Sequence, residues 1–576
     1  MLELSIEKVT CETGRNRFKG NMPENEKDKE RNMLKEKNMQ TVTRVGRFNG
    51  LASLAAALLM VSASCLQAAV YTNANVDADW DSTSRWVGGV APNWGDTANS
   101  NTLLWDVTLA TAAYCTNSTG SGTFNINGLK VLNPSAQIYV TNNSSAFLIR
   151  GSGSAGAGID MSAATVDMTL DGSAANKMLY FEGDTYTISI ATNRTLRLLN
   201  TQGEAVRIRN ATVNLNGPGT LVFNKDWVVG ADYAAGVATL NIDSGTLTNS
   251  ADGVLYVGNG TTGVVNQAGG RVALYKMYAG QTRSGTYNLS GGTLTVRDNL
   301  LVGINANNGV LNVTGGTLVQ AGGTFHIGYN RSGTGSYIQS GNSTVTANVF
   351  RVAGASSGNV TISNGTFYAK SWDRLAREDS TTGRLWLAGG RAILPQFPTL
   401  RGSGAYADIT FDGGTLSPRI ASTTYMQGLD HAYLTANGAV FDTAGNNITV
   451  AQVLENAASQ IGTLTKTGTG TLTLSGTNTY SGATVVTNGT LNLTHAQCLA
   501  TNSTVYLYTT ATNNLAFTGT NTIRMLYVNG ELQQAKRVYG ANTLGGAKNL
   551  SPVLSGSGYY YPAEGAAPRG TMIQIF

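Results

Sequence analysis

The sequence contains few of the residue types that most often carry out catalysis or bind metals. Its 576 residues include 4 cysteines and 3 histidines, and only 13% of the residues are charged. His326, His431 and His495 lack the spacing of metal ligands, so each is predicted to be a turn or surface residue. The chain has no glycine-rich loop followed by Lys and Ser or Thr, and no nucleophile elbow with an assignable triad. The sequence therefore predicts no cofactor and no metal site.

Long apolar runs are also scarce, and the one near the N-terminus is short. Arg44 and Arg47 precede the apolar residues 51–63, which are followed by Gln67, Ala68 and Ala69. This is the pattern of a secretory signal peptide over residues 39–69, and the apolar stretch is too short to span a bilayer. The mature chain is predicted to begin near Ala69 or Val70.

The region before the mature chain leaves two alternatives open. Residues 1–38 combine many charges with few apolar residues, so they are either a disordered leader or a misassigned start before Met39. Cys65 follows Ser62, Ala63 and Ser64, which faintly resembles a lipoprotein cleavage box, although removal of Cys65 with the signal peptide is the favoured interpretation. No other segment has 18 consecutive apolar residues, so no transmembrane segment is predicted in the mature chain.

The mature chain lacks both an excess of charge and a set of disulfides. From residue 70 onward, 28 Lys and Arg stand against 26 Asp and Glu, so nucleic-acid binding is not predicted. Only Cys115 and Cys498 remain, and exported domains stapled by disulfides contain many more cysteines. The fold must therefore depend on backbone hydrogen bonds and an apolar core.

What the sequence has in abundance is glycine and an internal repeat. There are 70 glycines, and a similar corner recurs six times between Ala238 and Lys370. The apolar anchors of these corners, 25, 22, 24, 27 and 22 residues apart, are Leu247, Val272, Leu294, Leu318, Val345 and Phe367. A period in the low twenties is typical of a solenoid.

Each repeat reads as short strands separated by turns. Apolar residues alternate with Thr, Asn and Ser, as at Leu240 and Ile242 or Leu311 and Val313, and this pattern favours strands. About 24 residues hold three short strands and their turns, and stacked copies pair in parallel. The predicted fold is all-β, a parallel β-helix with rungs of about 24 residues. The spacing of a leucine-rich repeat is absent, and propeller blades would be longer.

Two glutamines interrupt the apolar rows of this pattern. Gln267 and Gln339 fall where other rungs have Leu289 and Val313. If they point inward, each must form hydrogen bonds at a corner, because an unpaired buried amide costs about 1–3 kcal/mol. We expect them to hold neighbouring rungs in register.

One C-terminal segment resembles a known family. Its blocks 464–468, 470–474 and 478–482 occur in the order and spacing of the autotransporter-associated β-strand repeat, found in bacterial autotransporter passengers and related secreted proteins. Residues 80–97 and 526–540 are similar to the opening and closing segments of such passengers. The resemblance implies a right-handed parallel β-helix at or beyond the cell surface and implies no catalytic residues. The residues that carry the repeat motif are Lys466, Gly468, Gly470, Leu472, Leu474, Gly476, Asn478, Tyr480 and Gly482.

These observations divide the mature chain into five parts. The predicted parts are an N-terminal cap with the first rungs (70–135), β-helix repeats (136–370), an irregular charged junction with further rungs (371–460), the family repeat (461–494), and C-terminal rungs with a cap (495–576).

The densest charge cluster of the mature chain lies in residues 371–379, together with Arg384. Because the repeat rhythm stops here, the favoured interpretation is a solvated loop or half-turn of helix that joins two β-helical blocks. The alternative is a site like those of carbohydrate-active β-helices, which use clustered carboxylates and basic residues. That alternative requires the carboxylates to line one groove with Asp408 or Asp412. The candidate ligand-binding residues of the cluster are Asp373, Arg374, Arg377, Glu378 and Asp379.

Aromatic residues offer a second kind of candidate site. They could form an exposed strip that stacks on sugars, although packing in the core or at corners is the commoner role. The residues of this candidate strip are Tyr275, Tyr278, Tyr329, Tyr368 and Trp372.

The sequence as a whole predicts a secreted or cell-surface structural and adhesive β-helix without catalytic activity. Its expected partners are extracellular glycans or cell-surface components. The alternative is a polysaccharide lyase or glycoside hydrolase on the same scaffold.

Overall fold

The chain divides into two units, Met1–Gln67 and Ala68–Phe576, and all described residues lie in the second. In this computed structural model, the predicted leader, signal peptide and Cys65 fall outside the described residues, and the first strand, β1, begins at Val70. Before residue 158 the structure describes residue 137 and strands β1 to β8. From 158 to 566 it describes every residue except 173–178, 201–203, 233–234, 251, 306, 331–332 and 544–545.

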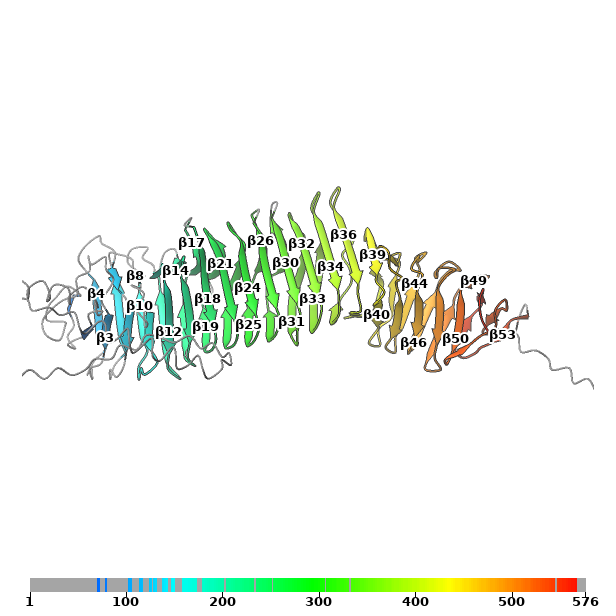
Figure 1. Ribbon diagram of the computed structural model, residues 1–576, viewed down its shortest axis with the longest axis horizontal. Helices are drawn as coiled ribbons and strands as arrows, with labels where there is room; N and C mark the ends of the chain where they lie inside the picture. Colours follow the sequence, from blue (N-terminus) through cyan, green and yellow to red (C-terminus); the bar gives the residue numbers. More distant parts are fainter. Residues whose placement is uncertain are drawn as a thin grey trace, which may run out of the picture. The chain divides into compact units, whose positions relative to one another are not determined.

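The described chain is a parallel β-solenoid whose central rungs have three faces, stacked side by side along the unit Ala68–Phe576 (Figure 1). Face 1 is a sheet of 16 strands, all paired in parallel. Its strands are β1 (Val70–Thr72), β3 (Thr102–Trp105), β6 (Gly128–Val131), β9 (Gly158–Met161), β12 (Thr185–Ile190), β15 (Thr212–Asn216), β18 (Val237–Ile242), β21 (Thr262–Gln267), β24 (Gly285–Leu289), β27 (Gly309–Val313), β30 (Thr334–Gln339), β32 (Ser357–Ile362), β34 (Thr382–Leu387), β36 (Tyr406–Phe411), β39 (His431–Leu434) and β42 (Glu455–Asn456).

Faces 2 and 3 together form a sheet of 29 strands, because two long strands, β31 (Thr344–Val352) and β33 (Thr366–Leu375), run through both faces. Face 2 contains β2 (Ala78–Asp79), β4 (Ala113–Asn117), β7 (Ile138–Asn142), β10 (Met168–Asp171), β13 (Thr195–Leu199), β16 (Thr220–Phe223), β19 (Thr246–Asn249), β22 (Arg271–Leu274), β25 (Thr293–Val296), β28 (Thr317–Gln320), β35 (Arg391–Leu394), β37 (Thr415–Pro418), β40 (Ala439–Asp442), β43 (Leu464–Thr467), β45 (Ala483–Val486), β47 (Thr504–Leu507) and β50 (Met525–Val528), with β51 (Glu531–Leu532) antiparallel to β50. Face 3 contains β5 (Phe124–Ile126), β8 (Phe147–Arg150), β11 (Leu179–Glu182), β14 (Glu204–Arg209), β17 (Asp226–Ala231), β20 (Val254–Asn259), β23 (Lys276–Ala279), β26 (Leu300–Ile304) and β29 (Phe325–Asn330).

The C-terminal rungs are shorter than the central ones. Paired residues on face 1 are 22 to 26 positions apart between β21 and β30, whereas those on face 2 are 20 or 21 apart from β43 to β50. Face 1 ends at β42, and two smaller sheets complete the structure. They contain β38 (Ser422–Met426), β41 (Ile448–Val450), β44 (Thr471–Leu474), β46 (Gly489–Leu493), β48 (Ala511–Leu515) and β54 (Leu554–Gly556) in one, and β49 (Thr520–Ile523), β52 (Tyr539–Gly540), β53 (Lys548–Asn549) and β55 (Tyr559–Pro562) in the other.

The predicted fold class is confirmed. The structure is all-β with about 14 turns and rungs of about 25 residues, and no α-helix occurs among the described residues. In that part of the chain, no helix has the length and apolar character that a membrane crossing requires.

The core consists of apolar rows that run along the stack, one residue from each rung. On face 2, Leu247, Val272, Leu294 and Leu318 lie in register and are fully buried. Burying apolar area at about 25 cal/mol per Å² is the main favourable term, and each rung contributes through its neighbours. Tight corners keep the rows aligned. At Gly280, φ is 74° and a Cβ would lie 2.6 Å from the carbonyl oxygen of Asn308 in the next rung, so only glycine fits.

Polar rows also stack from rung to rung. On the outer side of face 1, each amide nitrogen donates to the amide oxygen of the preceding rung at 2.7–2.9 Å. These four bonds join five asparagines in one row, the asparagine ladder: Asn214, Asn241, Asn266, Asn288 and Asn312.

The predicted roles of the two glutamines are confirmed. Gln267 and Gln339 are fully buried. The amide of Gln267 donates to the carbonyl of Thr293 in the next rung at 3.1 Å and accepts from the hydroxyl of Tyr287 at 2.7 Å. Gln339 donates to the carbonyl of Thr366 in the next rung at 3.1 Å and accepts from the hydroxyl of Tyr337 on its own strand at 2.8 Å. Each glutamine therefore ties two rungs together.

The predicted break at residue 371 is not found. Residues 371–375 are the end of β33, which pairs with β31 and β35, and face 1 continues without interruption through β34, β36 and β39. The loop or half-turn of helix expected there is therefore wrong for these five residues. The solenoid changes later, where β38 begins the six-stranded sheet and face 1 ends at β42.

Candidate ligand-binding groove

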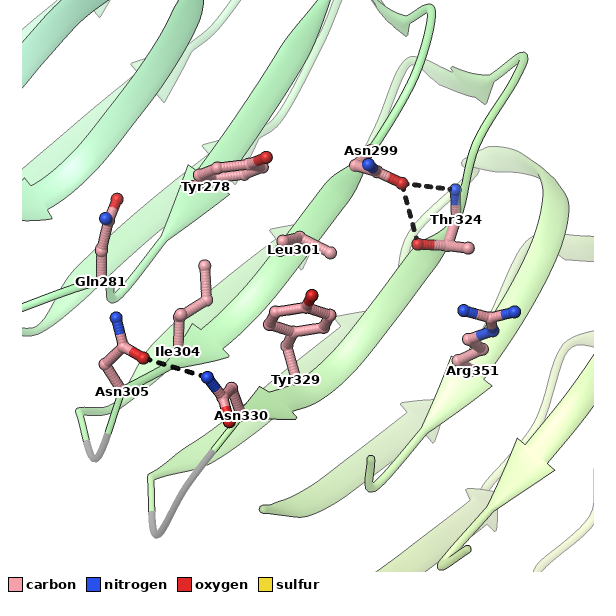
Figure 2. Close-up of a pocket in the computed structure, with 10 residues that line it drawn as sticks. All are labelled: Tyr278, Gln281, Asn299, Leu301, Ile304, Asn305, Thr324, Tyr329, Asn330 and Arg351. Carbon is pink, nitrogen blue, oxygen red and sulfur yellow. Dashed lines mark hydrogen bonds between the residues drawn. The ribbon is translucent and has the colours of Figure 1, made fainter. Parts of the chain in front are cut away.

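A groove with a volume of about 380 Å³ lies on the outer side of face 3, across β23, β26, β29 and β31 (Figure 2). Its floor follows one register row, in which Tyr278, Leu301, His326 and Arg351 occupy successive rungs. Leu301 and Ile304 point outward into the groove but are almost fully buried within it.

Two tyrosine rings lie on this apolar floor. Tyr278 is half-buried and packs edge-on against Tyr256, with ring centres 5.5 Å apart. Tyr329 has 42% of its surface exposed. Burial and the nearby Asp298 raise the pKa of Tyr278, so its hydroxyl stays protonated and can donate a hydrogen bond.

Side-chain amides surround the rings. Asn299 accepts hydrogen bonds from the backbone and hydroxyl of Thr324, both at 3.0 Å, and Asn330 donates to Asn305 at 3.4 Å, as the dashed lines in Figure 2 show. The carbonyl oxygen of the Gln281 side chain is buried and has no hydrogen-bond partner among the described residues. The groove thus places side-chain amides beside two aromatic rings.

An arginine closes the groove at one end and is fixed by a carboxylate outside it. The Nε and Nη2 groups of Arg351 donate to the two carboxylate oxygens of Asp373 at 2.8 and 2.7 Å. Burial alone would raise the pKa of Asp373, but the hydrogen bonds and charge of Arg351 and the charge of Arg374 outweigh it and lower that pKa. Asp373 is therefore ionised at neutral pH.

The predicted binding residues are only partly brought together. Asp373 reaches the groove through Arg351, and Arg374 lies beside them with its Nη1 3.6 Å from Glu378. Arg377, Glu378 and Asp379 are exposed in the turn that follows β33. Asp379 accepts a hydrogen bond from the backbone of Ser403 at 2.6 Å.

The aromatic strip is corrected in one respect. Trp372 is only 4% exposed, packs on Phe350 and Phe397, and donates from Nε1 to the carbonyl of Arg374 at 2.8 Å. It therefore cannot present a ring to a ligand. Tyr368 is half-buried on the face 2 part of β33 and does not line the groove. Of the predicted strip, Tyr278 and Tyr329 lie in the groove.

The carboxylates that the enzymatic alternative requires have separate partners. Asp408 lies on face 1 in register with Arg384, whose Nε is 3.5 Å away. Asp412 accepts from Thr435 and Asn437 at 2.6 and 2.7 Å. Among the described contacts, none joins either residue to Asp373.

Face 1 carries a second cluster that the sequence reasoning missed. In addition to Arg384 and Asp408 it contains His431, stacked on Tyr433 at 4.9 Å and bonded through Nδ1 to Glu455 at 2.7 Å. Burial raises the pKa of Asp408. Arg384, Asp408 and His431 lie in register on β34, β36 and β39. The sequence contains these residues, but recognising the cluster required the register between three rungs.

The histidine expectation fails at His326, which is 1% exposed. It lies between Leu301 and Arg351 beneath Gly354, where an added Cβ would be 2.6 Å from Nε2. Neither ring nitrogen has a hydrogen-bond partner among the described residues. Burial, together with the charges of Arg351 and Arg374, lowers the pKa of His326 to about 3. No group of three or more His, Cys, Asp or Glu that could hold a metal occurs in the described part of the chain.

The repeat motif near the C-terminus has a structural explanation. Lys466 is fully buried, and its ammonium donates to the carbonyls of Thr467, Gly468 and Asn488 at 2.8–3.0 Å. Burial lowers the pKa of Lys466 to about 8. Asn478 is also buried and links the backbone of Leu454 to that of Cys498 on neighbouring rungs, at 2.8 and 2.7 Å. The motif thus supplies polar side chains that tie successive rungs together.

The β-solenoid fold and the C-terminal repeat fit a secreted autotransporter passenger domain. Residues 464–493 match the model of the passenger-associated-transport-repeat family, which confirms the resemblance found in the sequence. This family implies a secreted or surface protein. No curated protein and no solved structure matches the chain.

Lys466→Met should destabilise the C-terminal rungs by about 2 kcal/mol, because the carbonyls of Gly468 and Asn488 lose a buried donor. The loss should appear in thermal unfolding and as faster hydrogen exchange in β43 to β46. Lys370→Met, at an exposed position on β33, is the matched control and should change neither. An equal effect of the two substitutions would contradict the role assigned to Lys466.

Proposed function

We propose that this protein is a non-catalytic, exported or cell-surface β-solenoid that binds glycan chains in the groove on face 3. The observation that carries the proposal is the presence of two accessible tyrosine rings, Tyr278 and Tyr329, within a shallow groove rich in side-chain amides. The family repeat supports the location, because it occurs in secreted or surface proteins.

The groove has the chemistry that sugars require. The apolar faces of a pyranose ring stack on aromatic rings, while its hydroxyls need both donors and acceptors. Tyr329 offers an exposed ring, and Gln281, Asn299 and Asn330 offer amides around it. The strands that hold these residues belong to a rigid ladder, so the groove is largely formed before a ligand binds.

Binding should be found on a glycan array with the exported chain, and Tyr329→Ala should weaken the strongest interaction about tenfold, or about 1.4 kcal/mol, in a titration. Tyr508→Ala is the matched control, because Tyr508 has a similar exposure of 41% but lies in the C-terminal rungs. If no glycan binds, or if both substitutions weaken binding equally, the proposal is wrong.

The same samples test the absence of catalysis. No new reducing ends should form when the protein is incubated with the glycans that it binds. The strongest candidate for an acid is Asp408, since burial raises its pKa and Arg384 and His431 lie next to it in register. Glycan cleavage that Asp408→Asn abolishes would establish an enzyme instead.

A further inference from the structure

We propose that the groove selects uncharged glycans and that Asp373 sets this preference by neutralising Arg351. The inference rests on the proposed function, because it concerns which sugars the same groove accepts. It starts from the contacts of Arg351, the one ionised side chain among the described residues that line the groove.

The positive charge of Arg351 is compensated by Asp373 before any ligand binds. Two of its five N–H groups, on Nε and Nη2, are bonded to the two oxygens of Asp373. This bidentate geometry is the arrangement that a uronate or another anionic sugar would otherwise occupy. An anionic ligand would therefore have to displace Asp373 or lie beside it.

Two further ion pairs lie near the described residues of the groove. Arg374 lies 3.6 Å from Glu378, and Lys276 lies 3.6 Å from Asp298 at the opposite end of the floor. With Arg351 and Asp373, these make three ion pairs whose formal charges cancel. His326, which belongs to the same register row but is covered by the turn at Gly354, is uncharged at neutral pH because its pKa is lowered to about 3.

A neutral glycan meets no such barrier. The remaining N–H groups of Arg351 can donate to sugar hydroxyls. A carboxylate placed next to Asp373 would lose hydration without gaining an uncompensated cation, which is unfavourable. The groove is therefore suited to hydroxyl-rich, uncharged sugars.

The experiment compares the neutral oligosaccharide that binds most tightly on the array with its derivative oxidised to a carboxylate at C6. The wild-type protein should bind the neutral form at least tenfold more tightly. Asp373→Asn frees the charge of Arg351 while keeping the shape of the side chain, so it should reduce that preference about tenfold or reverse it. The preference of the variant should return toward that of the wild type in 0.5 M salt, because the new attraction is electrostatic.

Glu378→Gln is the matched control. It removes the same charge from the neighbouring ion pair with Arg374 but does not touch a residue that lines the groove. It should leave the preference unchanged, and both variants should unfold at the wild-type temperature. Wild-type binding of the oxidised sugar as tight as that of the neutral one, or equal shifts in the two variants, would overturn the inference, whereas binding of no sugar at all would overturn the proposed function.

Discussion

Leu294→Asp should unfold the rungs around β25, with a local loss of about 3–5 kcal/mol. Leu294 is fully buried between Val272 and Leu318 in the apolar row of face 2, so aspartate would place an unpaired charge there. Because a solenoid is stabilised by contacts between neighbouring rungs, the loss should be concentrated in β22, β25 and β28. Hydrogen exchange measured by mass spectrometry would show it as a loss of protection in these strands.

Thr295→Asp is the control for this substitution. Thr295 is the next residue of the same strand and points outward, so the same charge there keeps its water. The free energy of unfolding of these strands should change by no more than about 0.5 kcal/mol, as for ordinary surface substitutions. Equal loss of protection in the two variants would mean that the inner and outer sides of β25 have been assigned wrongly.

Acidification should loosen the rungs that carry the groove, and His326→Leu should prevent this. The pKa of His326 is lowered from 6.5 to about 3, so between these values the unfolded chain binds a proton that the folded chain does not. The free energy of unfolding therefore falls as pH falls through this range. Between pH 7 and pH 4.5 the loss should be about 2–3 kcal/mol, at 1.36 kcal/mol per pH unit below 6.5.

The measurement is the hydrogen exchange of β26, β29 and β31 at both pH values. His326→Leu should keep protection at pH 4.5 and should be at least as stable as the wild type at pH 7, because two unpaired ring nitrogens are removed from the core. His495→Leu, in the C-terminal rungs, should leave the acid loss in place. If His326→Leu loses protection on acidification as the wild type does, His326 is not its cause.

The repeating part of the fold could be predicted because the local order of residues along each rung determines it. Each rung repeats the alternation of apolar and polar residues, so the burial of Leu294 and Leu318 follows from the same rule. The cost of leaving an amide unpaired predicted the bonds of Gln267 and Gln339 in the same way.

The environment of Trp372 could not be predicted, because alternation fails twice on β33. Where the strand turns from face 2 to face 3, two neighbouring residues, Lys370 and Ser371, both point outward. Further along, the register with β31 shifts between Phe350 and Arg351, because Phe350 pairs with Trp372 but Arg351 pairs with Arg374. Trp372 is therefore directed inward, while Asp373 is directed outward toward Arg351.

The groove itself could not be read from the sequence either. Its side chains come from four rungs, and they meet only because the turns have particular lengths. His326 is outward in the alternation of β29 but is covered by the turn at Gly354, and no local pattern encodes that cover. Tyr278 and Tyr329 were identified as aromatic candidates, whereas Gln281, Asn299 and Asn330 carried no distinguishing signal.

The asparagine ladder gives five central rungs the same outer contact. Every one of its four bonds has the same donor, the same acceptor and the same direction, so no bond depends on which rung it joins. A rung such as 266–287 can be copied or deleted, and the two cut ends still meet as asparagine against asparagine. The number of rungs therefore sets the length of the solenoid and the distance between its two ends. Related proteins can be expected to differ by whole rungs here, with the outer row of asparagines kept.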